Sequence, residues 1–160
     1  MATETDVDAA SIRRTEVSWS NGALGGFLGT LAFGAVQYAV GAVGIIAVAI
    51  PALYGISGPN LLAGWLIHLF HGVVLGLVYA AVVSTTSLRE YGTRLTGGVV
   101  LGLGYGVVTT VVLAALVMPV WLGAVGFPNA PPLPNFTVPS LVFHLVYGVV
   151  LGGTYAARTD

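Results

Sequence analysis

The sequence predicts an all-α membrane protein with four transmembrane helices. Apolar residues make up 56% of the 160 positions and charged residues only 7%, whereas a soluble domain carries about 25% charged residues. Four apolar stretches each supply the roughly 20 residues that a helix needs to cross a bilayer. None of them contains Asp, Glu, Lys or Arg: residues 21–50, 61–83, 96–118 and 139–157. They do not alternate apolar and polar residues as the strands of a membrane β-barrel do.

A phrase of fourteen residues occurs twice and predicts an internal repeat. Residues 68–81 read HLFHGVVLGLVYAA and residues 144–157 read HLVYGVVLGGTYAA, so ten of fourteen positions are identical at an offset of 76 residues. We expect two units, each a helix, an outer loop and a helix, at residues 19–83 and 96–160, joined by a cytoplasmic turn at 84–95. Two spans per unit keep the copies parallel, which predicts a pseudo-two-fold axis along the membrane normal.

The basic residues predict the orientation. The chain has no Lys, and its five Arg precede the first stretch, separate the second from the third or follow the fourth: Arg13, Arg14, Arg89, Arg94 and Arg158. Basic residues concentrate in cytoplasmic loops. We therefore expect a multi-pass protein of the cell (plasma) membrane with both termini in the cytoplasm. Residues 1–18 are polar and are expected to form a mobile cytoplasmic tail.

The second outer segment, residues 119–139, is both apolar and rich in proline. It contains six Pro together with Trp121, Phe127 and Phe136. Proline disfavours a helix interior, and the apolar side chains disfavour a solvated loop. We expect the segment to lie along the outer interface or to cap the bundle, with a partner-docking surface as the alternative.

Glycines at intervals of four define one face of each repeated helix. His68 is followed by Gly72 and Gly76, and His144 is followed by Gly148 and Gly152. Residues four apart lie on one stripe of a helix, and small residues allow membrane helices to approach closely. We therefore expect these glycines to be packing residues and both His to face the bundle interior.

The two interior His residues can be interpreted in two ways. In the first, His68 and His144 belong to helix packing and each satisfies its ring with a hydrogen bond. In the second, they are the two axial ligands of a b-type haem, with His71 as a neighbour or alternative ligand. The absence of Arg and Lys from the outer segments, where propionates would need cations, favours the packing reading. No metal site is expected, because His71 is the only further ligand near the pair and the chain has no Cys.

Transport is a further alternative, in which the chain is one protomer of a small oligomeric transporter or channel. The polar candidates for a pathway are Gln37, Tyr38, Thr109 and Thr110. No carboxylate lies within the apolar stretches, which argues against coupling to protons or sodium.

The favoured interpretation is a non-enzymatic accessory or structural subunit of a larger membrane assembly. The chain contains no nucleophile–base pair, carboxylate dyad or phosphate-binding loop, so we expect no enzyme activity. The expected partners are the lipid bilayer and either further copies of the chain or another membrane protein. Nucleic acid is not an expected partner.

As a whole, the chain resembles the small, four-span, glycine-rich membrane proteins of salt-loving archaea. The resemblance rests on the acidic Thr- and Asp-bearing tail, the absence of Lys and Cys, and the phrase WLIHLFHGVVLG at residues 65–76. It implies a multi-pass membrane protein and no particular activity. Bis-His membrane cytochromes are similar only in having paired His within a helical bundle.

Overall fold

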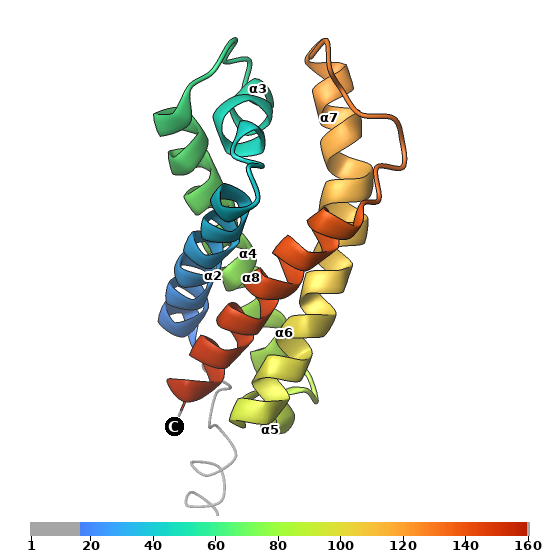
Figure 1. Cartoon of the computed structure of the whole chain (residues 1–160). Coiled ribbons are helices and arrows are strands. Elements are labelled where there is room, and N and C mark those ends of the chain that lie inside the picture. The colour runs from blue at the N-terminus through green and yellow to red at the C-terminus, as the bar shows by residue number, and fades with distance from the viewer. Residues whose placement is uncertain (1–16, 160) are drawn as a thin grey trace, which may run out of the picture.

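In the computed structural model, which describes residues 17–159, every regular element is a helix (Figure 1). The elements in chain order are α2 (Trp19–Ala39), the π-helix η1 (Ile45–Ala49), α3 (Ile50–Ala52), α4 (Leu61–Thr85), α5 (Arg89–Gly92), α6 (Leu95–Thr109), the π-helix η2 (Thr110–Val117), α7 (Met118–Ala124) and α8 (Val138–Ala157). Most of the expected cytoplasmic tail, with Arg13 and Arg14, lies outside the described residues.

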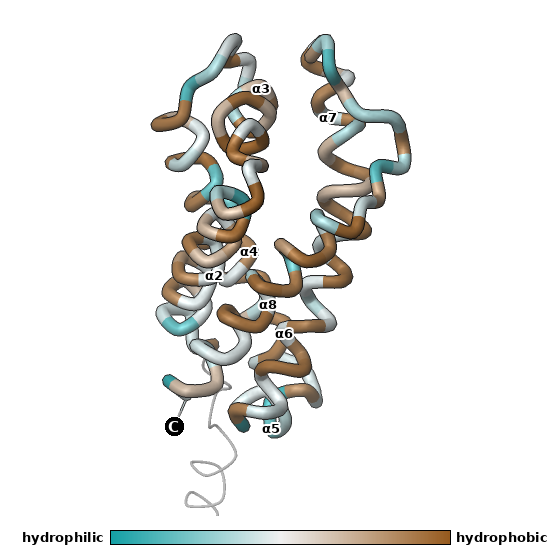
Figure 2. The backbone as a smooth tube through the Cα atoms, viewed as in Figure 1, coloured by the Kyte–Doolittle hydropathy of each residue, from teal (hydrophilic) through white to brown (hydrophobic). Residues whose placement is uncertain are grey.

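Within residues 17–159, three helices are long and apolar enough to cross a membrane. They are Leu61–Thr85, Leu95–Ala124 and Val138–Ala157, and the second of them is the continuous run of α6, η2 and α7. Figure 2 shows apolar residues along most of their length, with hydrophilic residues mainly in the connecting segments and at the ends. This confirms an all-helical protein with apolar, span-length helices, but the expected count of four such helices is wrong by this measure.

The first expected span fails because residues 21–50 do not form one helix. α2 ends at Ala39, and Gly41 then adopts a φ of +75°, a left-handed conformation that glycine adopts without steric cost. The amide of Ala42 returns to the carbonyl of Gln37 at 2.7 Å. Beyond this turn, η1 and α3 form a separate segment that packs on the start of α4. Three buried polar residues of α2 also lower its average hydropathy: Asn21, Thr30 and Gln37.

Two prolines at the outer end are accommodated within helices by the same hydrogen-bonding arrangement. Pro51 and Pro119 each follow a π-helix, and each removes the amide that would bond a carbonyl in the preceding turn. The carbonyl four residues before Pro51, that of Ala47, accepts instead from the Asn60 amide at 2.7 Å. The Ala115 carbonyl, four residues before Pro119, accepts from the Asn135 amide at 2.9 Å. A returning loop thus replaces each missing hydrogen bond.

Because Pro119 is accommodated within a helix, the outer segment is shorter than the sequence predicted. The helix continues through Pro119 to Ala124, so the irregular segment covers residues 125–137 rather than 119–139. The two outer ends meet in a small apolar cluster, where Ala52 and Leu53 of the α3 region pack with Leu122 of α7.

The long helices form two pairs, and α8 is the helix that joins them. α4 lies beside α2 and α6 lies beside α8, while α8 also packs across α2 (Figure 1). The main core lies at these crossings and draws side chains from α2, α4 and α8: Phe33, Tyr79, Ala80, Val83, Phe143, Tyr147, Leu151 and Tyr155. The turn that holds α5 and the end of α8 lie at one end of the molecule, opposite α3 and α7.

Candidate functional site

The first helix pair is held together through glycine surfaces. A β-carbon at Gly22 would lie 2.5 Å from the Gly76 carbonyl oxygen and 2.6 Å from the Ala80 β-carbon, and one at Gly26 would overlap the Gly72 carbonyl oxygen. The two backbones are therefore in direct contact. As the numbers rise along α2 they fall along α4, so the two helices are antiparallel.

The second pair repeats this arrangement. A β-carbon at Gly98 would lie 2.5 Å from the Gly152 carbonyl oxygen and 2.6 Å from the Ala156 β-carbon, and one at Gly102 would overlap the Gly148 carbonyl oxygen. Three of the glycines that we singled out on α4 and α8, Gly76, Gly148 and Gly152, thus lie against glycine backbone of the neighbouring helix, whereas Gly72 lies against the Thr30 side chain.

Tyrosine hydroxyls connect one pair to the other. Tyr147 of α8 donates to the Gly72 carbonyl at 2.8 Å, and Tyr105 of α6 donates to the Leu75 carbonyl at 2.8 Å. Tyr79 of α4 donates to the Gly98 carbonyl at 3.2 Å. Each bond gives a hydroxyl inside an apolar bundle a partner on another helix, which fixes how the pairs are placed against each other.

His68 and His144 lie against the same aromatic ring. The ring of Phe33, on α2, is 4.9 Å from that of His68 and 5.0 Å from that of His144, centroid to centroid, and both pairs are edge-to-face. Phe33 is 8% exposed. The structure therefore brings the two His to one interior cluster, but through an aromatic residue that the sequence did not indicate.

The three His rings differ in their hydrogen bonds. His144 donates from Nδ1 to the Ser140 carbonyl of its own helix at 2.7 Å. The His71 ring packs against that of Tyr54, and its Nε2 is hydrogen-bonded to the Tyr54 hydroxyl at 2.6 Å. His68 Nε2 is buried and has no partner. Of the two rings that the packing interpretation concerns, the His144 ring has a hydrogen bond, to a carbonyl of its own helix, whereas the buried Nε2 of His68 has none.

A b-type haem does not fit this arrangement. The space that the glycines were expected to leave for a porphyrin is filled by backbone of the neighbouring helix at Gly76, Gly148 and Gly152 and by the Thr30 side chain at Gly72. Phe33 occupies the position next to both candidate ligands. Among residues 17–159, no three His, Cys, Asp or Glu side chains come together in a way that could hold a metal ion.

The polar residues considered for transport have different surroundings. Thr109 and Thr110 both donate to the Gly106 carbonyl of their own helix, at 3.1 and 2.8 Å, and the Tyr38 hydroxyl accepts from the Trp65 indole at 3.3 Å. Gln37 is different. Its side chain is 1% exposed, and neither its amide nitrogen nor its amide oxygen has a partner. Gln37 and His68 are the buried polar groups in this part of the chain whose hydrogen-bonding capacity is unused.

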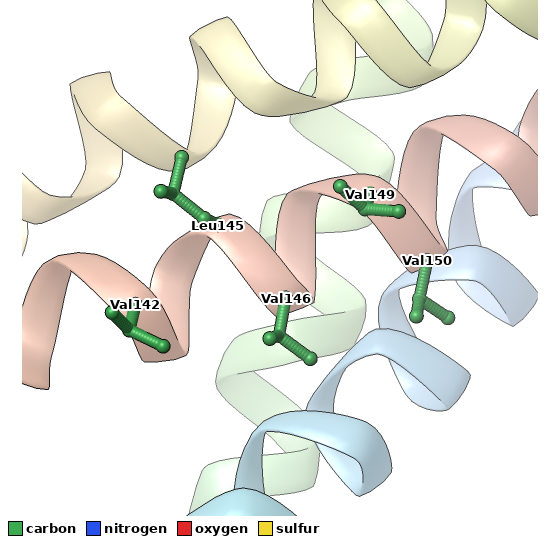
Figure 3. Close-up of a pocket in the computed structure, with 5 residues that line it drawn as sticks. All are labelled: Val142, Leu145, Val146, Val149 and Val150. Carbon is green, nitrogen blue, oxygen red and sulfur yellow. The ribbon is translucent and has the colours of Figure 1, made fainter.

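A shallow hollow of about 270 Å³ lies on the surface of α8 and is lined by apolar side chains alone. It is lined by apolar side chains of that single helix: Val142, Leu145, Val146, Val149 and Val150 (Figure 3). Because it offers no hydrogen-bonding group, it suits contact with lipid chains and not recognition of a polar ligand.

The fold and the cluster together define the class of protein. It is a helical protein with apolar helices suited to a membrane. Glycine contacts between the helices close its interior, which contains the polar side chains of Gln37 and His68. No protein-family model matches the chain, and neither a curated protein nor a solved structure has significant similarity to it.

Proposed function

We propose that this chain is a four-span, non-enzymatic membrane protein that serves as an accessory or structural subunit. The observation that carries the proposal is the use of the interior glycines, which make backbone contacts between helices and leave the helix pairs locked together. Packing of this kind supports a fixed scaffold.

In this proposal α2 is the fourth span. It packs along α4 through Gly22 and Gly26 and against α8 through Gly25 and Gly29, so it lies in direct contact with two membrane-length helices. Three of its polar residues, Asn21, Thr30 and Gln37, are buried. Apolar side chains on its outer face are exposed and would meet lipid: Leu24, Phe27, Leu28 and Leu31. An average hydropathy over the whole helix combines the buried polar face with the exposed apolar face, and it therefore underestimates how apolar the exposed face is.

The two halves are, in this proposal, copies of one unit related by a pseudo-two-fold axis. The contacts of Gly22 with Gly76 and of Gly98 with Gly152 are separated by the offset of 76 found in the sequence. The π-helix, proline and returning Asn amide at both outer ends support the same relation. That similarity occurs where the sequences of the halves do not visibly match.

The turn between the halves faces the cytoplasm in the proposed topology, as do both termini. Arg89 and Arg94 lie around α5 and Arg158 follows α8, at the end of the molecule opposite α3 and α7 (Figure 1). This agrees with the excess of basic residues in cytoplasmic segments. The outer segment and the start of α8 then carry exposed apolar side chains that would contact the interface or a partner subunit: Leu133, Phe136 and Val138.

Single-cysteine labelling tests the topology, because the chain has no Cys of its own. Ser57→Cys and Asn129→Cys should react with a membrane-impermeant maleimide in intact cells. Ser18→Cys and Ser87→Cys should react only after the membrane is opened. Labelling of Ser18→Cys from outside would show that α2 does not cross and would contradict the four-span arrangement.

Extraction in native lipid, without detergent, tests the subunit role. A 16.3-kDa chain that works as a subunit should emerge in particles of larger protein mass, with a fixed stoichiometry of either its own copies or another membrane protein. Mass spectrometry of the intact particles would distinguish these two cases. Particles that contain a single 16.3-kDa chain would contradict the proposal.

A further inference from the structure

Gln37 is a polar side chain in a position where an unused hydrogen bond is costly. It is 1% exposed, and its amide group has two donors and an acceptor, none of them partnered. Buried polar groups in proteins almost always have a partner, either another protein group or ordered water. In a chain that spans a membrane the surrounding lipid cannot supply one.

The second unused group lies on the neighbouring helix α4, opposite Phe33. Gln37 is one helical turn beyond Phe33 on α2, a rise of about 6 Å, and the Phe33 ring contacts the ring of His68. His68 Nε2 is buried and lacks a partner. Next to Phe33, Gly34 lies against the ring of Trp65, one turn from His68. Residues 33–37 of α2 therefore lie alongside residues 65–68 of α4.

The surroundings specify an uncharged ligand. The rings around His68 and Phe33 are those of Trp65, Phe143 and His144, and α2, α4 and α8 contain no Asp, Glu, Lys or Arg. Nothing there would compensate a buried charge. The ligand must also be small, because the glycine contacts below Phe33 close the space between α2 and α4.

We propose that Gln37 and His68 form a binding site for an ordered water molecule, which bridges the Gln37 amide and His68 Nε2. Water both donates and accepts, so it can satisfy the amide and the imidazole at once. Two hydrogen bonds of about 2.8 Å reach between groups that are too far apart to bond directly. Internal waters of this kind typically make two to four bonds to groups that are otherwise unsatisfied.

The site can be observed by solid-state NMR of the full chain in lipid bilayers, with ¹⁵N in the Gln side chain and the His rings. Gln37 is the single Gln of the sequence, so its amide signal is unambiguous. In water-edited spectra, magnetisation should pass rapidly from water to the Gln37 amide and to His68 Nε2. His144 Nδ1, which bonds the Ser140 carbonyl, is the internal control and should receive it much more slowly.

Two variants assign the bridge. Gln37→Leu should abolish the transfer to His68 Nε2 and leave the His144 signal unchanged, and His68→Phe should abolish the transfer to the Gln37 amide. If either variant fails to fold, the transfer of magnetisation from water to Gln37 and His68 in the wild-type protein is the test of the proposal. The proposal is overturned if wild-type Gln37 receives no magnetisation from water, if a direct Gln37–His68 hydrogen-bond coupling appears, or if the signals depend on an added solute rather than on buffer alone.

Discussion

Glycine backbone forms the closest contacts between the helices, and this shapes the interior more than any polar group does. A β-carbon at Gly76 would lie 2.9 Å from the α-carbon of Gly26, a distance at which only a hydrogen can stand on the glycine. In lipid there is little hydrophobic gain from bringing helices together, so such contacts carry much of the association. The tyrosine hydroxyls then use the carbonyls that close approach exposes, as Tyr147 does with Gly72.

Gly26→Ala and Gly102→Ala should therefore destabilise the protein to a similar extent. Both new methyl groups would meet helix backbone, which cannot rotate away, and overpacking of this kind costs about 1–3 kcal/mol. Gly104→Ala is the matched control, because it is also mid-helix but has nothing within 4 Å of a β-carbon. Unfolding in mixed micelles at increasing denaturing detergent measures the difference. Equal stability of Gly26→Ala and Gly104→Ala would contradict the packing described.

Among the helical elements, α4 and α8 were the most predictable, and the segment after α2 the least. α4 is mostly apolar and contains no Asp, Glu, Lys or Arg. It is preceded by Pro59 and by Asn60, whose side chain caps its first turn by accepting from the Ala63 amide. By contrast, residues 40–50 are as apolar as the helix before them, so composition does not reveal the turn at Gly41. That turn is visible only as one glycine among 23.

The helix through Pro119 was not predictable for a different reason. Its freed carbonyl is partnered by the amide of Asn135, which is distant in the sequence, and rules for proline consider only its near neighbours. In the candidate site, the four-residue spacing placed His68 and His144 in the interior. Phe33, which joins them, had no such signal, because the residue at its repeat position is Thr109. Its spacing of four from Gly29 and Gln37 is the one local indication of an inward face.

The turn at Gly41 should respond to substitution in a way that separates conformation from packing. Gly41→Ala should destabilise the protein by about 1–2 kcal/mol, the cost of a left-handed conformation for a residue with a β-carbon, since Gly41 has a φ of +75° and open space around it. Gly44→Ala is the control, because Gly44 also has open space but a helical φ of −57°. The same detergent titration compares them. A Gly41→Ala protein as stable as Gly44→Ala would show that α2 and η1 are joined by a different backbone path.

On the scale of the whole molecule, the two halves are separately packed and jointly anchored. Each half has its own glycine-to-glycine helix pair, α2 with α4 and α6 with α8. Between the halves lie the tyrosine hydrogen bonds, the core cluster around Phe33 and Tyr155, and the bond from the Asn21 amide to the Arg158 carbonyl at 2.8 Å. The covalent link is a short exposed turn that includes Ser87 and Leu88. The interface, more than the link, should therefore keep the halves together.

A chain divided between Ser87 and Leu88 should accordingly reassemble when both pieces are made in one cell. Each piece keeps a complete helix pair, so each can insert and pack alone before the two associate. Affinity purification through a tag on one piece should recover the other in equal amount. Tyr147→Phe or Tyr105→Phe should weaken this recovery, because each removes one hydroxyl bond between the halves. An interhelical hydrogen bond in a membrane contributes about 0.6–2 kcal/mol, which corresponds to about a 3- to 30-fold change in the association constant. Tyr91→Phe, at an exposed position in the turn, should leave recovery unchanged. If both pieces accumulate in the membrane but are never recovered together, the link is what holds the molecule together and the interface is not self-sufficient.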